Sequence, residues 1–247
     1  MKADYGLDAP GLMRGFLLGG LVLLAMGIWL WLTTADFWLP GLGALFGALS
    51  VYPFGMAALM VFYSRVTKLA DRDKMLDCVD WANIRAVVDL GCGRGLLAIG
   101  AAKRMAEGSV TGVDIWSASD QSGNSATAAV RNADIEGVAD RVCFLTADMR
   151  ALPMAQGSVD LVLSAWAIHN LDKAEDRKQA LVEAARVLAP DGTIILSDIA
   201  GLADYEAILT GMGFKAQTQE FGPRRRRLLS AVSFGSFGPA MVTARRA

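Results

Sequence analysis

The sequence has few of the residues from which metal centres and disulfide frameworks are built. Its 247 residues include three cysteines and a single histidine. Cys78, Cys92 and Cys143 show neither metal-ligand spacing nor redox spacing, and His169 alone cannot supply a histidine-rich metal site. We therefore predict no bound metal and expect reduced thiols.

Charge is sparse and evenly balanced. Lysine and arginine total 24 against 25 for aspartate and glutamate, which leaves a net charge of −1 at pH 7. Proteins that bind nucleic acid usually present a basic face. The balance therefore argues against a nucleic-acid partner.

Charge is missing altogether from two long stretches near the N-terminus. As a helix, residues 15–32 would be about 27 Å long, which is close to the thickness of the hydrocarbon core of a membrane. Residues 41–63 would reach about 34 Å and would cross with some tilt. We predict a two-span transmembrane helical hairpin within residues 1–70, followed by a separate domain over residues 71–247.

Basic residues flank the predicted hairpin on its outer sides. Lys2 and Arg14 precede the first stretch and Arg65 and Lys68 follow the second, whereas residues 33–40 between the stretches contain no lysine or arginine. Because cytoplasmic flanks carry the excess of positive charge, we predict an integral, multi-pass membrane protein with both ends and the following domain in the cytoplasm. A cleaved signal peptide is the alternative for the first stretch, which is long for a signal core and is followed at once by a second stretch.

Small residues recur at a spacing of four within the predicted hairpin. Gly15 with Gly19, and Gly43 with Gly47, would let two helices approach closely. Packing within the hairpin and self-association into a homo-oligomer are both open at this point.

A glycine turn at residues 87–95, of sequence VVDLGCGRG, organises the rest of the chain. An apolar run that ends in a carboxylate and alternating glycines predicts a buried strand entering a tight turn, and Leu96 begins a run typical of a helix. Backbone N–H groups at a helix N-terminus suit a nucleotide-like ligand. Leu96 also stands where the dinucleotide fingerprint requires its third glycine, which disfavours a nicotinamide or flavin cofactor.

Strand-like and helix-like segments then alternate to the end of the chain. The predicted strands after the first one cover residues 109–116, 141–150, 160–170, 193–199, 214–220 and 240–245, with a turn at Pro190, Asp191 and Gly192. Alternation of this kind predicts a parallel sheet whose ligands bind beyond the carboxyl ends of the strands. The expected fold class is α/β, a Rossmann-like, doubly wound, seven-stranded and mostly parallel sheet preceded by the hairpin.

Asp114 ends the second predicted strand, 25 residues after Asp89. An acid at about this distance beyond the glycine turn of a nucleotide-binding unit accepts hydrogen bonds from ribose hydroxyls. The alternative is an acid that caps the next helix. The polar residues 117–124 that follow are expected to form a loop, either at the edge of the active site or simply in solvent.

The acid-x-Gly-x-Gly-x-Gly turn resembles the first motif of class I S-adenosylmethionine-dependent methyltransferases of the type 11/25 kind, and the resemblance covers about residues 87–214. It implies that the turn cradles the methionine part of the cofactor, that Asp114 contacts the ribose, and that Asp148 and the backbone of Met149 contact the adenine. The predicted cofactor, S-adenosylmethionine, would be bound by Asp89, Gly91, Cys92, Gly93, Gly95, Asp114, Ile115, Asp148, Met149, Ser164 and Trp166.

His169 follows the fourth predicted strand and is the only histidine that can act as a general base. A structural histidine that caps the strand is the alternative. We expect a membrane-anchored methyltransferase for a lipophilic small-molecule acceptor. The competing hypotheses are a methyltransferase for a soluble small molecule and a non-catalytic scaffold that binds the cofactor in a membrane.

The connection at residues 221–239 is long and contains four consecutive arginines, from Arg224 to Arg227, followed by an apolar tail. Arginines near a membrane surface attract anionic lipid, so the segment is predicted to contact the bilayer and to help deliver the acceptor. A solvated charge run beside a core strand is the alternative.

Overall fold

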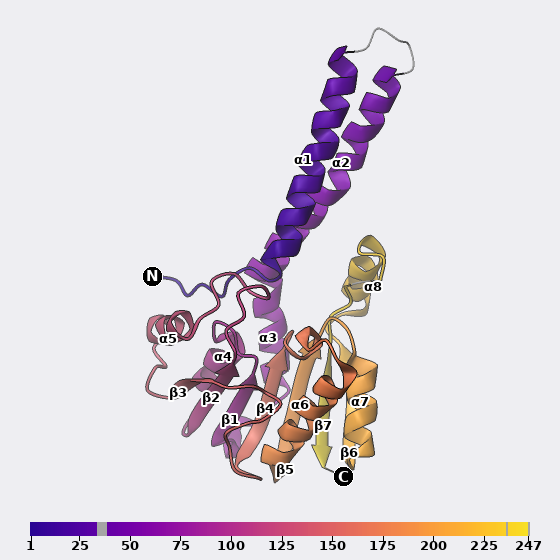
Figure 1. Cartoon of the computed structure of the whole chain (residues 1–247). Helices are drawn as coiled ribbons and strands as arrows, with labels where there is room; N and C mark the ends of the chain where they lie inside the picture. The colour runs from indigo at the N-terminus through magenta and orange to yellow at the C-terminus, as the bar shows by residue number, and fades with distance from the viewer. Residues whose placement is uncertain (34–38, 236, 247) are drawn as a thin grey trace. The chain divides into compact units, whose positions relative to one another are not determined.

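The structure, a computed structural model, describes residues 1–33, 39–235 and 237–246 (Figure 1). The chain divides into two compact units. The sheet unit comprises Met1–Tyr5, Leu69–Ser117 and Asn124–Ala247, and the hairpin unit comprises Gly6–Lys68 and Ala118–Gly123. The expected boundary after residue 70 lies two residues from this division. The sheet unit also includes Met1–Tyr5, however, and the hairpin unit includes the loop Ala118–Gly123 from the predicted domain.

The sheet unit contains a seven-stranded sheet with the strand order β3-β2-β1-β4-β5-β7-β6. The neighbours from β3 to β5 pair in parallel, and β7 runs antiparallel to both β5 and β6. The predicted mostly parallel sheet is confirmed. The strands are β1 Ala86–Leu90, β2 Ser109–Asp114, β3 Val142–Thr146, β4 Val159–Ala165, β5 Leu188–Asp198, β6 Phe214–Glu220 and β7 Ala240–Arg246.

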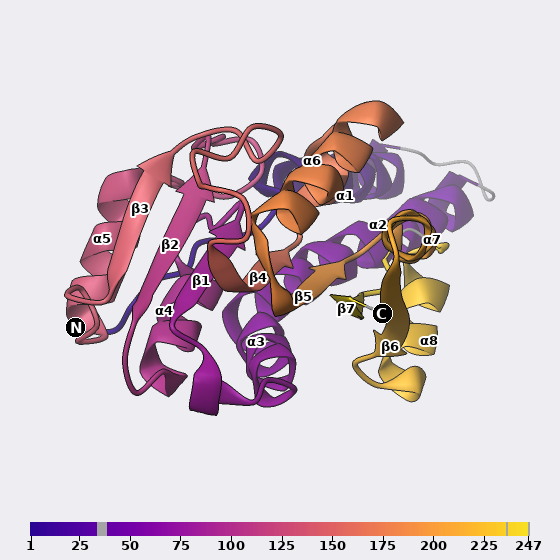
Figure 2. The ribbon, with the colours of Figure 1, turned by 90° about the horizontal axis from the view of Figure 1, so that it is seen from below.

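Helices cover both faces of this sheet, as Figure 2 shows for α6 on one side and α3 and α4 on the other. The central strands are mostly apolar, as expected for strands that are buried on both faces. Side chains of α6 and α7 pack on one face with Val88 and Leu90, and side chains of α3 and α4 pack on the other with Val87. The helices are α3 Lys68–Asp77, α4 Leu96–Arg104, α5 Ala126–Ile135, α6 Ala174–Val187, α7 Leu202–Gly211 and α8 Pro223–Val232, with short 3₁₀ turns at Trp81–Asn83 and Ile168–Asn170.

The predicted turn at Pro190, Asp191 and Gly192 is wrong, because β5 begins at Leu188 and runs through these residues. Its pairing with β4 shifts in register between Val159–Leu188 and Leu161–Thr193, so that one residue of β4 faces four residues of β5. The irregularity accommodates a proline that lacks an N–H donor. The register with β4 thus passes from Leu188 to Thr193 over the residues between them, which locally favour a turn.

The hairpin unit contains α1 Pro10–Thr33 and α2 Leu39–Phe62, followed by a π-helical segment at Tyr63–Thr67. The two helices approach closely at glycines, since a Cβ atom added to Gly27 would lie 2.7 Å from the carbonyl oxygen of Gly43. A Cβ on Gly15 or Gly19 would meet nothing within 4 Å among the described residues. A Cβ on Gly43 would lie 2.8 Å from the carbonyl oxygen of Gly27, whereas one on Gly47 would also meet nothing within 4 Å among the described residues. Glycine thus serves packing within the hairpin at Gly27 and Gly43, and self-association stays a prediction.

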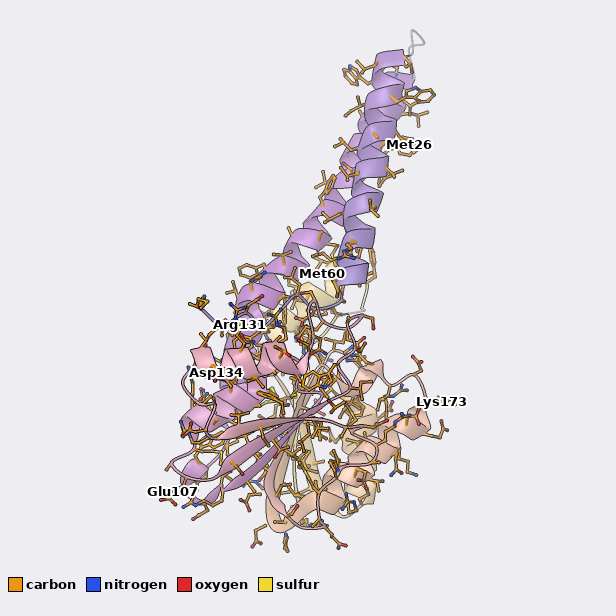
Figure 3. The ribbon with its side chains drawn as sticks, turned by 60° about the vertical axis from the view of Figure 1, so that its left-hand side comes forward. Met26, Met60, Glu107, Arg131, Asp134 and Lys173 are labelled. Carbon is orange, nitrogen blue, oxygen red and sulfur yellow. The ribbon has the colours of Figure 1, made fainter. Side chains whose placement is uncertain are left out.

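Both helices are long and apolar enough to cross a membrane. The candidate spans are Pro10–Thr33, with a mean hydropathy of 2.1, and Pro40–Asp77, with a mean hydropathy of 1.8, and only 11% and 17% of their apolar windows are buried. Core helices and signal sequences also meet criteria of length and composition. Figure 3 shows the side chains of both helices projecting outward along their length, with Met26 and Met60 labelled. The predicted connecting loop, with Ala35, falls largely outside the described residues.

Candidate functional site

The glycine turn between β1 and α4 is held tightly against neighbouring strands. Gly91 has a φ of 66°, and its N–H donates to the carbonyl oxygen of Val113 at 2.8 Å. A Cβ atom on Gly91 would lie 2.2 Å from the Cβ of Ala167, just beyond β4. Glycine is required here both by the backbone conformation and by the lack of space.

Asp114, at the end of β2, accepts hydrogen bonds from three separate segments. The N–H of Gly93 donates to Oδ2 at 2.7 Å, while the N–H of Trp116 and Nδ2 of Asn124 donate to Oδ1 at 2.5 and 3.3 Å. The N-cap of α5 is Ser125, whose hydroxyl accepts from the N–H of Ala128 at 3.1 Å. The alternative that Asp114 caps the next helix is therefore wrong. The carboxylate instead joins the glycine turn to the loop that follows β2.

Asp89 lies inside the protein, with 1% of its surface exposed. Its Oδ2 accepts from the N–H of Ala98 in the first turn of α4 at 3.0 Å, which fastens this helix to β1. Burial raises the pKa of Asp89 to about 8, and the negative charge of Asp114 adds to the effect while the Ala98 N–H opposes it. The buried side chain of Asp89 thus joins the two elements, β1 and α4, that flank the glycine turn.

Cys92 in the same turn is also buried, and burial raises the pKa of its thiol further above the usual range. The N–H of Cys92 donates to the carbonyl oxygen of Val113 at 3.1 Å. A protonated, buried thiol is not a nucleophile. Cys92 therefore contributes backbone and packing to the turn.

Asp148, which follows β3, carries an ion pair that sequence analysis missed. Oδ1 and Oδ2 both accept from Nε of Arg150 at 3.0 Å, and the same guanidinium reaches Oδ2 of Asp176 at 3.1 Å. These hydrogen bonds lower the pKa of Asp148 and keep it ionised. An acid followed two residues later by an arginine was the available signal.

The remaining predicted cofactor residues separate into buried and exposed groups. Ser164 is buried and donates to the carbonyl oxygen of Leu90 at 2.8 Å, so its hydroxyl joins β4 to β1. Ile115 is 64% exposed. The ring of Trp166 meets that of Phe237 edge to face, with 5.4 Å between centroids. Phe237 lies between α8 and β7, so this connection reaches the carboxyl edge of the sheet.

His169, in the 3₁₀ turn after β4, contacts a buried carboxylate at the end of β5. Its Nδ1 lies 2.5 Å from Oδ1 of Asp198, a close contact without hydrogen-bond geometry, and its backbone N–H donates to Oδ2 at 3.1 Å. The hydroxyl of Tyr205 also donates to Oδ2 at 3.1 Å, and the N–H of Ile199 donates to Oδ1 at 2.8 Å. The sequence places Asp198 at the same carboxyl edge of the sheet as His169, but it predicts neither their contact nor a role for Asp198.

The residues around the glycine turn fit a nucleoside cofactor. Three residues of the turn, Gly91, Gly93 and Gly95, have positive φ and carry no side chain. Asp114 supplies carboxylate acceptors beside it, and Oδ1 of Asn124 is buried with no hydrogen-bond partner among the described residues. Hydroxyl donors of a ribose match such acceptors. Within residues 1–33, 39–235 and 237–246, no group of three histidine, cysteine, aspartate or glutamate side chains is placed to hold a metal ion.

Residues 88–196 match the family model of the methyltransferase domain. This match runs from β1 into β5 and agrees with the resemblance that the glycine turn carries. This chain is 37% identical over 115 residues to 27-O-demethylrifamycin SV methyltransferase of Amycolatopsis mediterranei, covering 45% of this chain and 38% of the relative. It is 31% identical over 140 residues to methyltransferase GfsG of Streptomyces halstedii, covering 57% of this chain and 47% of the relative. The chain therefore spans less than half the length of either curated relative.

Solved structures share the fold of this chain. Geranyl diphosphate C-methyltransferase from Streptomyces coelicolor A3(2) aligns with a TM-score of 0.57 at 16% identity, over 77% of this chain and 84% of that chain. At this level of identity the likeness concerns the fold alone.

The raised pKa of Asp89 predicts a pH dependence of stability. The folded state holds the Asp89 proton more tightly than the unfolded state, so this contribution is complete below the ordinary aspartate pKa of 3.8 and is lost as pH rises towards 8. In Asp89→Asn the free energy of unfolding should therefore fall less than in the wild type between these pH values. Thermal unfolding of the full chain at a series of pH values measures this difference.

The matched control is Asp191→Asn, which changes an exposed carboxylate of β5. It should keep the pH dependence of the wild type. Identical profiles for wild type and Asp89→Asn would contradict the raised pKa.

Proposed function

We propose that this chain is an S-adenosylmethionine-dependent methyltransferase that acts on a small-molecule acceptor. The proposal depends most on one close approach: Gly91 of the glycine turn packs against Ala167, which follows β4. Ala167 lies two residues before His169. Cofactor-binding geometry and a candidate base thereby share one edge of the sheet. The curated relatives, which are methyltransferases by name, support the same class of reaction.

The bound cofactor supplies a methyl group made electrophilic by a sulfonium. With Nδ1 of His169 held against Asp198, Nε2 is the ring nitrogen left to accept a proton from the acceptor. Loss of this proton to Nε2 would free a lone pair of the acceptor to attack the methyl carbon, and the electrons of the broken sulfur–carbon bond would stay on the sulfur as the neutral thioether leaves. Asp198 stabilises the resulting imidazolium, and Tyr205 and the His169 N–H hold Asp198 in place.

His169→Ala should lower kcat by roughly a hundredfold while cofactor affinity is retained, because general-base catalysis contributes factors of this size. Asp198→Asn should also lower kcat, since it removes the charge that stabilises the imidazolium. The measurement is transfer of labelled methyl groups by full-length protein in native membranes, with label partitioned between organic and aqueous phases. Label in the aqueous phase would favour a soluble acceptor.

Tyr205→Phe is the matched control, because it removes one hydrogen bond to Asp198 and leaves the carboxylate present. An unchanged kcat in His169→Ala would show that His169 is not the general base and would favour its structural role. Cofactor binding without any methyl transfer by the wild type would favour a non-catalytic scaffold.

We further propose that α1 and α2 cross a membrane as a hairpin with the methyltransferase domain in the cytoplasm. Large apolar side chains along these helices are exposed, including Leu18 at 63%, Trp29 at 63% and Val51 at 68%. Such an array is unfavourable in water and is typical of a surface that faces lipid. The distribution of lysine and arginine supports cytoplasmic ends.

A cysteine introduced at Ala35, in protein with Cys78 and Cys143 changed to serine, should react with a membrane-impermeant maleimide in intact cells. The expected position lies outside the cytoplasm because its flanks lack lysine and arginine. The control is a cysteine at exposed Lys173, which should react only after lysis. Labelling at Ala35 only after lysis would overturn the orientation.

A lipophilic acceptor is the substrate class that we propose. Trp166, three residues before His169, forms an aromatic pair with Phe237. Aromatic rings are suited to contact apolar ligands. The structural relative that binds geranyl diphosphate provides a precedent for such an acceptor on this fold.

The connection that carries Phe237 also carries α8, which we propose contacts anionic lipid. Two of its four arginines are engaged within the sheet unit, since Arg225 donates to Asp71 at 2.7 Å and Arg226 pairs with Glu220. Arg224 and Arg227 are exposed and have no partner among the described residues. Leu228 and Phe234, 64% and 84% exposed, follow them. The predicted loop is thus a helix, and two arginines rather than four are available to lipid.

In full-length protein in nanodiscs, amides of residues 223–235 should exchange more slowly when phosphatidylglycerol is added to phosphatidylcholine. Arg224→Gln/Arg227→Gln should lose this protection, since two charges at about 1 kcal/mol each change the bound population roughly thirtyfold. Lys173→Gln/Lys178→Gln, at the N-cap of α6 and within it, removes the same charge as a control. Exchange that ignores the lipid composition would contradict the membrane role of α8.

A further inference from the structure

We propose that polar residues at the base of the hairpin position the loop that follows Asp114, so that the closed hairpin supports cofactor binding. We call this group, Asp8, Ser64, Lys68, Gln121 and Ser122, the clip. All five residues belong to the hairpin unit. The inference rests on the proposed cofactor role of Asp114 and is independent of the acceptor.

The centre of the clip is a buried ion pair. Nζ of Lys68 lies 3.2 Å from both carboxylate oxygens of Asp8 and donates to the carbonyl oxygen of Gly6 at 3.0 Å. The side chains of Lys68 and Asp8 are 8% and 22% exposed. Ser64 completes the arrangement, because its hydroxyl donates to Asp8 Oδ2 at 2.9 Å and accepts from the Asp8 N–H at 3.1 Å.

This ion pair joins the two ends of the hairpin. Asp8 lies two residues before α1, whereas Ser64 and Lys68 lie after α2. A buried charge is costly without its partner, so Asp8 and Lys68 favour one arrangement of the two ends.

The loop after β2 pairs with the segment that carries Asp8. Asp8 and Gln121 form an antiparallel bridge, and Nε2 of Gln121 donates to Asp8 Oδ1 at 3.3 Å. The N–H of Leu7 donates to Ser122 Oγ at 2.7 Å, and the N–H of Ser122 donates to the Leu7 carbonyl oxygen at 2.8 Å. The N–H of Ala9 donates to the Asp120 carbonyl oxygen at 2.8 Å. The middle of the loop is therefore held by backbone as well as side chains.

The two ends of the same loop hold Asp114. Trp116, in a left-handed conformation with a φ of 63°, donates its N–H to Asp114. Asn124 donates to Asp114 and to the carbonyl oxygen of Ser117, both at 3.3 Å. A loop held at its middle and at both ends is already ordered before a ligand arrives, which lowers the entropy cost of binding. We infer that Asp8, Gln121 and Ser122 are positioning residues for the cofactor.

The test uses full-length protein in nanodiscs and S-adenosylmethionine as the probe. Gln121→Ala/Ser122→Ala removes side-chain contacts of the loop and leaves the Asp8–Lys68 pair intact. We expect its Kd for the cofactor to rise about fivefold or more, with kcat at saturating cofactor unchanged and the melting temperature without cofactor within about 2 °C of the wild type. Ser122→Thr, which keeps the hydroxyl acceptor, should bind the cofactor as the wild type does.

Asp114→Ala separates this inference from the proposed site. If Asp114→Ala weakens binding and Gln121→Ala/Ser122→Ala does not, the clip inference is wrong and the site stands. If Asp114→Ala binds normally, both fail. Should the double variant not fold, amide exchange of the wild type without cofactor decides the question: slow exchange at Ala9 and Ser122 is expected, and free exchange there would overturn the inference.

Discussion

The carboxylate of Asp114 is the contact on which the arrangement of the candidate site depends. It accepts hydrogen bonds from the glycine turn through Gly93 and from both ends of the following loop through Trp116 and Asn124. A carboxylate has lone pairs for about four such bonds, so a ligand hydroxyl can join the donors already present. Charge-assisted bonds of this kind are stronger than neutral ones, which makes a short acidic side chain suited to hold three segments together.

Two buried carboxylates below this edge differ in how their charge is compensated. Asp89 has one backbone donor on its side chain and lies near the charge of Asp114, and burial raises its pKa to about 8. Asp198 is equally buried but meets two backbone N–H groups, the Tyr205 hydroxyl and the ring of His169. The same residue type thus supports the fold beneath the glycine turn and orients the candidate base at the end of β5.

The fold places these groups but does not by itself specify the acceptor. Parallel strands bring the ends of β1, β2, β4 and β5 to one edge, and many chemistries use such an edge. What is particular to this chain lies outside the shared core: the aromatic pair of Trp166 and Phe237, the two exposed arginines of α8, and a hairpin base that pairs with the loop after β2. The proposals about a lipophilic acceptor and about positioning of the loop depend on these features.

The sequence by itself determined the sheet, the glycine turn and the two apolar helices, because each depends on short-range patterns: alternating elements, glycines at positive φ, and uncharged runs of sufficient length. Tertiary structure alone decided that Asp198 meets His169, that Arg225 and Arg226 are engaged, and that Gln121 pairs with Asp8. These partners lie between 6 and 154 positions apart, and their meeting depends on strand order and register. The extension of β5 back to Leu188 has the same origin, since the pairing of Leu188 with Val159 of β4 lies beyond the residues that locally favour a turn.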